Sequence, residues 1–381
     1  MALKIAERGL VPPFIVMDVM REANRRQSAG QDVLHLEVGQ PSTGAPAGAV
    51  AVAKRLLDTD PLGYSTAFGN DALRERLSRH YRETYGAKVA AERIAITIGS
   101  SGAFLLAFLT AFAPGDRVGV PAPSYPAYRN ILTALGIEPV LLPVGAGTHF
   151  HTDVALLRSC GERLDGLILA SPSNPTGSML DRDALFAVAD WCAANGVRFI
   201  SDEIYHGVTY SVAAATAAER PGAIVVNSFS KYYAMTGWRL GWMVLPEDMV
   251  RPVECLAQNL FISPPALSQH VALAALDCTD ELDANVARYA RNRDILLQEL
   301  SKAGFDRMAP ADGAFYLYAD ISRFSNDSEE FCRRMLAETG VATTPGVDFD
   351  PLAGRHFMRF SFAGAEAEMR EAARRLQAWS K

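Results

Sequence analysis

Short apolar runs alternate with amphipathic helical patterns through the middle of the chain, from about residue 93 to residue 245. The apolar runs have the length of strands and are rich in Val and Ile, and most are joined by a segment with helical spacing. Such alternation is typical of parallel strands connected by helices. We expect strands at 94–98, 116–120, 139–142, 166–170, 197–200, 223–226 and 241–245, with helices that include 102–112, 125–135 and 183–194. The pattern predicts an α/β fold with a mainly parallel seven-stranded sheet and flanking helices.

The pattern changes beyond about residue 280. A long, charged helical segment covers 281–303, and two shorter apolar runs follow it. The N-terminal stretch as far as residue 44 also lacks the strand and helix alternation. We therefore predict two domains, a large one of residues 45–280 and a smaller α+β domain that combines residues 1–44 with 281–381.

Composition narrows the classes of partner. The chain has 381 residues, of which 49% are apolar, so it can bury a large core. The net charge of -6 is spread over interspersed acids and bases, without the basic stripe that nucleic acid or anionic lipid requires. The five cysteines are scattered and form no CxxC pair. Small-molecule partners, reduced thiols and a cytoplasmic location are the expectation, because no targeting segment or membrane span is evident.

Polar residues follow the predicted strands at the edge where open α/β sheets bind ligands. Gly99-Ser100-Ser101-Gly102 follows the strand at 94–98 and opens a helix, so it can cradle a phosphate. Tyr125 lies in a proline-rich turn after the next strand, where it could stack on a planar cofactor. An ordinary helix cap and an ordinary turn tyrosine are the alternatives.

Two further loops carry more specific chemistry. Ser171-Pro-Ser-Asn174-Pro-Thr-Gly177 has a fixed backbone that directs the amide of Asn174, although a plain Asn-Pro turn is the alternative. Asp202 and Tyr205 follow the strand at 197–200. A carboxylate there could pair with a protonated pyridine nitrogen, and the phenol could reach the ring oxygen. The alternative is a helix-capping aspartate beside a surface tyrosine.

The segment Ser228-Phe-Ser-Lys231, continued to Arg239, supplies an amine beside hydroxyls and a guanidinium. A lysine that forms a Schiff base, next to groups that bind a phosphate ester, is what a pyridoxal-phosphate enzyme requires. Most lysines are solvated surface residues. The hypothesis therefore depends on all five loops meeting at one edge of the sheet.

These residues resemble the class I and II aminotransferases, which are fold-type-I pyridoxal-phosphate enzymes. The resemblance extends from Gly39 to Arg359 and covers nearly the whole chain. It is carried by Ser171–Gly177, Ser201-Asp-Glu-Ile-Tyr205, Ser228–Lys231 with Met235-Thr-Gly-Trp-Arg239, and Met358-Arg-Phe-Ser-Phe362.

The resemblance implies an aminotransferase that moves an amino group between an L-amino acid and a 2-oxo acid by a ping-pong mechanism, through an internal aldimine on Lys231. It implies catalytic roles for Lys231, Asp202 and Tyr205, and a substrate carboxylate bound by Arg359 with help from Asn174 and Gly39. The implied contacts to pyridoxal 5'-phosphate come from Ser100, Ser101, Tyr125, Asn174, Asp202, Tyr205, Ser228 and Arg239, with Tyr64 reaching the phosphate across the interface of a homodimer.

Several alternatives stay open. A C-S β-lyase or a cyclopropane-forming enzyme would use the same cofactor, and a non-catalytic sensor could bind it. Arg359 could instead be an edge-strand arginine paired with a surface acid. A metal site is not expected, because His149-Phe-His151 lacks a further ligand and fits a solvated loop better. His206 departs from an acidic residue found in some aspartate-specific relatives. Alanine, aspartate, aromatic and branched-chain substrates all remain possible, and no second cation for a distal carboxylate is evident.

Overall fold

The computed structural model describes residues 3–379, and its largest element is a seven-stranded sheet. The strand order is β2-β8-β7-β6-β5-β3-β4, and every pairing is parallel except those of β8, which is antiparallel to both neighbours. The strands are β2 (Ile94–Thr97), β3 (Arg117–Ala122), β4 (Glu138–Pro143), β5 (Gly166–Ala170), β6 (Arg198–Asp202), β7 (Ile224–Ser228) and β8 (Gly241–Val244). The predicted mainly parallel sheet is confirmed.

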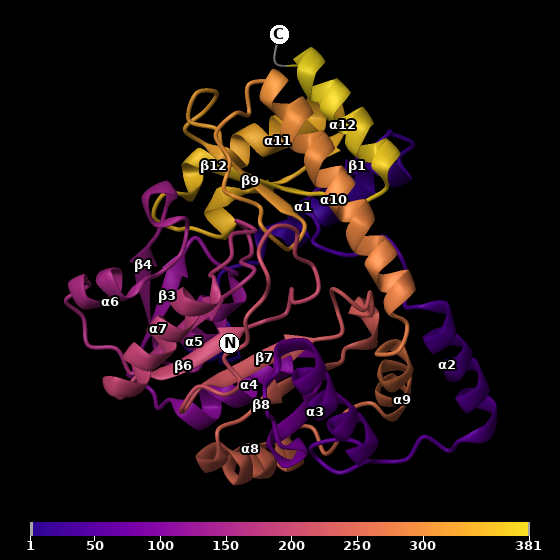
Figure 1. Ribbon diagram of the computed structural model, residues 1–381. Coiled ribbons are helices and arrows are strands. Elements are labelled where there is room, and N and C mark those ends of the chain that lie inside the picture. Colours follow the sequence, from indigo (N-terminus) through magenta and orange to yellow (C-terminus); the bar gives the residue numbers. More distant parts are fainter. Residues whose placement is uncertain (1–2, 380–381) are drawn as a thin grey trace.

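Alternating side chains of the strands bury opposite faces of the sheet under two layers of helices. On β5, Leu167 and Leu169 enter one apolar core while Ile168 enters the other. This two-sided burial explains why the strands read as continuous apolar runs. The helices of this part are α2 (Ala47–Thr59), α3 (Asp71–Tyr85), α4 (Gly99–Ala111), α5 (Ala127–Ala134), α6 (Val154–Ser159), α7 (Arg182–Ala194), α8 (Glu247–Leu260) and α9 (Ala266–Ala275) (Figure 1).

Three expected boundaries differ from the structure in ways that matter for the site. The helix after β2 begins at Gly99 rather than at residue 102, so Ser100 and Ser101 lie within its first turn. Strand β6 continues to Asp202, which pairs with Val226 on β7. Strand β7 continues to Ser228 rather than ending at residue 226. Both strands are extended by backbone pairing with the next strand, which an apolar run does not reveal.

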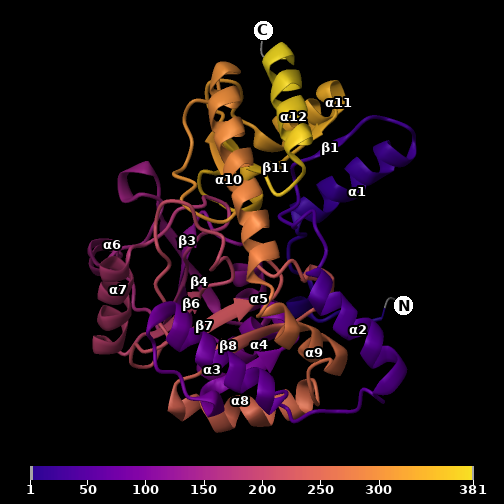
Figure 2. The ribbon, with the colours of Figure 1, turned by 45° about the vertical axis from the view of Figure 1, so that its right-hand side comes forward.

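A third apolar core lies between a three-stranded antiparallel sheet and the C-terminal helices. This sheet has the order β11-β12-β9, and α10 runs from it down toward the seven-stranded sheet (Figure 1, Figure 2). The elements of this part of the molecule are α10 (Thr279–Lys302), β9 (Tyr316–Asp320), α11 (Ser328–Thr339), β10 (Val341–Ala342), β11 (Thr344–Pro345), β12 (Phe357–Ser361) and α12 (Glu366–Trp379). The change of pattern near residue 280 coincides with the start of α10.

The N-terminal segment joins this second part of the molecule. Strand β1 (Leu34–His35) pairs in parallel with β10, and α1 (Ile15–Ser28) lies beside it (Figure 2). The predicted packing of the N-terminal stretch against the C-terminal residues is observed, whereas the domain boundaries at 44/45 and 280/281 stay a prediction. Within residues 3–379, no helix has both the length and the apolar character to cross a bilayer.

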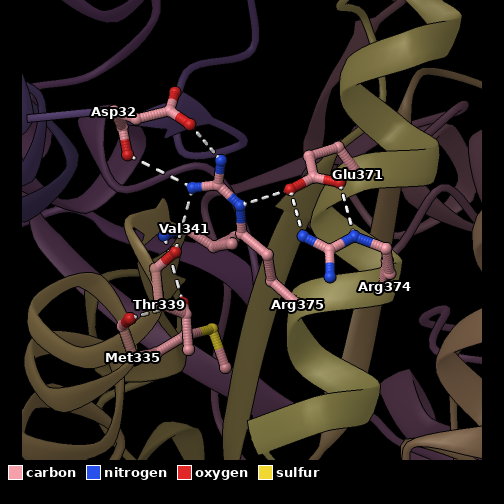
Figure 3. A network of polar contacts seen from close by, with 7 residues as sticks. All are labelled: Asp32, Met335, Thr339, Val341, Glu371, Arg374 and Arg375. Carbon is pink, nitrogen blue, oxygen red and sulfur yellow. Dashed lines mark hydrogen bonds and ion pairs between the residues drawn. The ribbon is translucent and has the colours of Figure 1, made fainter.

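Arg375 on α12 fastens the two ends of the chain together (Figure 3). Its guanidinium pairs with the carboxylate of Asp32, and it donates to the carbonyl oxygens of Asp32 (3.2 Å) and Thr339 (3.1 Å). Its Nε also pairs with Glu371 at 2.8 Å. Hydrogen bonds from Arg374 and Arg375 lower the pKa of Glu371 to about 2, so this carboxylate stays ionised at neutral pH. Asp32 lies just before β1, so the network supports the pairing of β1 with β10.

A buried hydrogen bond ties α3 to β8, the antiparallel strand. The Nε1 of Trp242 donates to the hydroxyl of Tyr81 at 3.0 Å, and both residues are about 1% exposed. We expect Tyr81→Phe to lower the free energy of unfolding by about 1–3 kcal/mol, because the buried indole N–H loses its acceptor. The shift in the urea-unfolding midpoint measures this loss. Tyr232→Phe is the matched control, because its hydroxyl bonds Asp283 in an exposed contact, and it should shift the midpoint less. Equal shifts would contradict the prediction.

Candidate active site

A cavity at the carboxyl ends of the parallel strands brings most of the predicted site residues together. Its walls come from the seven-stranded sheet, the N-terminal segment and the small sheet. The predicted residues that line it are Gly39, Ser100, Ser101, Tyr125, Asn174, Asp202, Tyr205, Lys231, Arg239 and Arg359. The convergence of five loops on one sheet edge is therefore observed.

Lys231 lies just after β7 and points its amine at the N-terminal segment. Its Nζ donates a hydrogen bond to the carbonyl oxygen of Gly39 at 2.6 Å. Burial, followed by the charges of Arg359 and Arg239, lowers the pKa of Lys231 to about 8, although Asp202 opposes the shift. A lysine with such a pKa has a substantial neutral fraction near physiological pH, which suits a nucleophile or a base.

Asp202 presents a buried carboxylate at the end of β6. Its Oδ2 accepts a hydrogen bond from the hydroxyl of Tyr128, and its Oδ1 accepts from the backbone N–H of Ile204 at 3.0 Å. Burial raises the pKa of Asp202 to about 6, against the lowering effect of these hydrogen bonds and of Lys231. A cationic group in the cavity, such as a protonated ring nitrogen, would favour the ionised form further.

Arg359 lies on β12, and the hydrogen bonds that hold it go to neutral oxygen atoms. Its Nη1 donates to Oδ1 of Asn174 at 2.7 Å, and its Nη2 donates to the carbonyl of Glu37 at 2.6 Å. The guanidinium carbon lies 4.2 Å from the ring centroid of Tyr316 and 4.6 Å from that of Phe349. Among residues 3–379, its buried Nε has no hydrogen-bond partner. A cation fixed between two rings in this way is suited to an incoming carboxylate.

Tyr205 and Gly39 both contact Tyr316, a residue that the sequence did not single out. The hydroxyls of Tyr205 and Tyr316 lie 2.7 Å apart. A Cβ atom on Gly39 would lie 1.6 Å from the hydroxyl oxygen of Tyr316, so only glycine allows this approach. Tyr316 escaped notice because its segment reads simply as an apolar strand.

The first turn of α4 and Arg239 form a corner of hydrogen-bond donors. Ser100 and Ser101 lie at the positive end of the helix. Gly99 has φ +65°, and a Cβ there would lie 2.3 Å from Nη2 of Arg239, so the glycine lets the guanidinium reach the helix end. Ser230, one of the hydroxyls that precede Lys231 in the sequence, also lines the cavity, as does Thr236, which was not predicted. Hydroxyls, helix N–H groups and a guanidinium are the donors that a phosphate ester needs.

Two predicted residues lie outside this cavity. The hydroxyl of Ser228 donates to the carbonyl of Leu240 at 3.0 Å and accepts from the N–H of Ser230 at 3.1 Å, so it shapes the turn that precedes Lys231. Tyr64 is 83% exposed and borders a separate depression with Gln269. Phosphate binding by Ser228 and by Tyr64 stays a prediction.

The N-terminal segment supplies an uncharged and largely apolar wall of the cavity, with Gln40 as its polar member. Its apolar members are Phe14, Val16, Met17 and Val38. The only cations among the described lining residues are Lys231, Arg239 and Arg359, already named at the site. A substrate side chain at this wall would therefore meet hydrocarbon and the uncharged Gln40 rather than a charge.

The histidines singled out by the sequence lie outside the lining of the cavity, and the expected solvated loop is wrong for His151, which is buried. Nε2 of His149 lies 3.3 Å from Oδ2 of Asp312, and burial lowers the pKa of His151 to about 4. His206 is buried behind the site, between the hydroxyl of Tyr85 (2.9 Å) and the carbonyl of Ser171 (3.1 Å). Over residues 3–379, no group of three or more His, Cys, Asp or Glu side chains could hold a metal ion.

Comparisons with known proteins agree with this geometry. The family model described as aminotransferase class I and II matches residues 31–376. The chain is 49% identical to the valine–pyruvate aminotransferase of Mycobacterium tuberculosis, over 99% of this chain and 98% of the relative. It is 32% identical to the arginine–pyruvate transaminase of Pseudomonas aeruginosa, over 94% of this chain and 93% of that protein. A crystal structure of an aminotransferase from Mycobacterium tuberculosis superposes with a TM-score of 0.98 at 48% identity and 99% coverage of both chains.

The pKa of Lys231 can be tested directly on the cofactor-free protein. We expect acetylation of its amine by acetic anhydride to rise with pH about a midpoint near 8, because only the neutral amine reacts. Peptide mass spectrometry at a series of pH values measures the midpoint. Arg359→Met should move the midpoint to higher pH, since a nearby positive charge is removed. Arg355→Met, at an exposed arginine of the same segment, is the control. A midpoint above 10, or one that Arg359→Met leaves unchanged, would contradict the assignment.

Proposed function

The chain belongs to the class I and II aminotransferases, and on that basis we propose that it uses pyridoxal 5'-phosphate to move an amino group between an apolar L-amino acid, such as valine, and pyruvate. One observation carries the choice of substrate. The cavity offers Arg359 for one carboxylate, and the wall formed by the N-terminal segment is uncharged, with Phe14, Val16, Met17 and Val38 as its apolar members and Gln40 as its polar one. The matched relatives are transaminases, which favours transamination over the C-S β-lyase. Two of them are named for pyruvate, which supports this acceptor.

The donor set of the cavity fits pyridoxal 5'-phosphate. Asp202 would pair with the ring nitrogen, and Tyr205 and Asn174 would bond the ring oxygen. The first turn of α4, with Arg239, would hold the phosphate, and Tyr125 would stack on the ring. Three observations support this fit: the buried carboxylate without a cationic partner in its hydrogen bonds, the glycine that admits Arg239 to the helix end, and the depressed pKa of the lysine.

The chain's own residues account for the chemistry. When bound, the cofactor supplies an aldehyde for the amine and a ring that stabilises negative charge at the substrate Cα. Arg359 binds the substrate carboxylate and fixes which Cα bond faces Lys231. The amine of Lys231 takes the Cα proton, a task for which a pKa of about 8 is well matched. Asp202 stabilises positive charge on the ring nitrogen, while Tyr128 holds the carboxylate in place.

We further propose a cytoplasmic enzyme. The five cysteines are unpaired, which is typical of a reducing compartment. The predicted large and small domains also remain our proposal, supported by separate apolar cores around the two sheets.

A donor and acceptor screen tests the substrate proposal. Valine with pyruvate should give a kcat/KM at least about tenfold above that of aspartate, because the apolar wall would leave the second carboxylate of aspartate unpaired. The first half-reaction is followed by the absorbance of the bound cofactor, and 2-oxoglutarate is compared as acceptor. In the matched variant Arg359→Ala, all amino acids should lose turnover while cofactor content is kept. Preference for aspartate would refute the substrate class, and release of pyruvate and ammonia from a cysteine conjugate would indicate a lyase.

The proposed homodimer rests on Tyr64, which is too exposed to serve its own cavity. A mixture of Tyr64→Phe and Lys231→Ala chains tests it. Each variant alone should be impaired: Tyr64→Phe by an about tenfold weaker hold on the cofactor phosphate, because a hydrogen bond to a charged group is lost, and Lys231→Ala by the loss of the amine.

After unfolding and refolding together, the mixed chains should regain turnover at low cofactor concentration. In a hybrid dimer, one site would combine an intact Lys231 with an intact Tyr64 from the other chain. Separately refolded variants, mixed only in the assay, are the control. If co-refolding restores nothing although hybrids form, Tyr64 does not act across an interface.

A further inference from the structure

The first helix is capped by a carboxylate from the far end of the chain. Asp348 lies in a 3-10 turn, Gly346–Asp348, and is only 1% exposed. Its Oδ1 accepts from the backbone N–H of Ile15 and its Oδ2 from that of Val16, both at 3.1 Å. These are the first two residues of α1, and the preceding residue, Phe14, makes no side-chain cap. A carboxylate at this end also matches the positive end of the helix dipole.

The capped turn is the same segment that forms the apolar wall of the active site. Phe14, Val16 and Met17 line the cavity, and the ring of Phe14 packs edge-on against Tyr125, with centroids 5.7 Å apart. Figure 2 shows α1 on the side of the second sheet, extended away from the seven-stranded sheet. The helix N-terminus is therefore the part of α1 that reaches the site, and Asp348 bonds the backbone at that point.

The turn that carries Asp348 is itself anchored to the frame of the site. The guanidinium of Arg129 on α5 donates to the carbonyl oxygens of Asp348 and Phe349. The N–H of Ser124 donates to the carbonyl of Phe349 at 3.1 Å, and the Phe349 ring packs on Arg359. One short turn thus connects α1 with α5 and with the arginine proposed to bind the substrate carboxylate.

We propose that Asp348 is a positioning residue that holds the first turn of α1 as a wall against the amino-acid side chain, and so sets the preference for a branched over a short side chain. The inference rests on the proposed function, because it takes the α-carboxylate to lie on Arg359. A valine side chain, larger than the single methyl of alanine, would depend more on the position of this wall. Disturbing the wall should therefore affect valine more than alanine.

The variants Asp348→Ala and Asp348→Asn test the proposal, with Asp350→Asn as the control. Asp350 is a buried acid of the same segment, but its carboxylate bonds the N–H of Leu352 rather than α1. In the cofactor-free protein, Asp348→Ala should speed amide hydrogen exchange in residues 15–19 by about fivefold or more, since removing a helix cap destabilises the first turns. Asp350→Asn should leave that exchange unchanged.

In the loaded enzyme, Asp348→Ala should lower kcat/KM for valine by about tenfold, mainly through KM, and that for alanine by less than about twofold. Asp348→Asn keeps one acceptor oxygen and should restore part of the valine preference. An unchanged ratio of valine to alanine in Asp348→Ala would overturn the proposal even if exchange increased. Equal losses for both amino acids would do the same, because they would indicate damage through Phe349 and Arg359.

Two outcomes distinguish a failure of the proposed function from a failure of the role of Asp348. If the unaltered enzyme does not transaminate valine, the proposed function fails, whereas the exchange measurement still decides whether Asp348 caps α1. If Asp348→Ala does not fold, Asp348→Asn decides the matter through the same ratio. Unchanged exchange in residues 15–19 in a folded Asp348 variant would overturn the positioning role itself.

Discussion

Three cationic side chains face one cavity with a single carboxylate among its described lining residues. Lys231, Arg239 and Arg359 oppose Asp202, so the cavity carries excess positive charge in a partly desolvated space. Like charges held this close raise the free energy of the protein until anions enter. The excess charge matches a ligand pair that brings a phosphate and a carboxylate. The depressed pKa of Lys231 follows from the same arrangement.

Side chains pack closely against glycine backbone around the site. Gly39 lets Tyr316 lie against the N-terminal segment, and Gly99 lets Arg239 lie against the start of α4. Each contact joins elements far apart in the sequence, and neither leaves room for a Cβ atom. Hydrogen bonds add to this at Arg359, which links β12 to the Asn174 loop and to the N-terminal segment. The cationic groups are thus fixed by parts of the chain that do not belong to a common element.

Much of the fold and of the site could be predicted because the motifs lie where strands end. Asp202, Lys231 and Asn174 stand out as polar residues after apolar runs, and the parallel sheet sends them to one edge. Tyr128 and Tyr316 could not be found in this way, since they lie within a regular helix and a regular strand and contribute only through tertiary contact.

Long-range pairing explains the other features of the structure that the sequence does not reveal. The antiparallel direction of β8 leaves no trace in its own residues, because an apolar run reads the same in either direction. The Asp348 cap is equally hidden, as it joins residues 332 positions apart. Ser228 is the last residue of β7 and shapes the turn, whereas Ser230 follows the strand and lines the cavity.

The parallel pairing of β1 with β10 delays the completion of folding during synthesis of the chain. Leu34 pairs with Val341, so a strand made early in synthesis must wait for one made about 300 residues later. At ribosomal rates of about 5–20 residues per second, that wait lasts roughly 15 to 60 s. Over this period the seven-stranded sheet can form while α1 and β1 remain without their partners. The N-terminal segment would then be the last to find its place, and a nascent chain would gain a complete catalytic pocket only after release of its C-terminal residues.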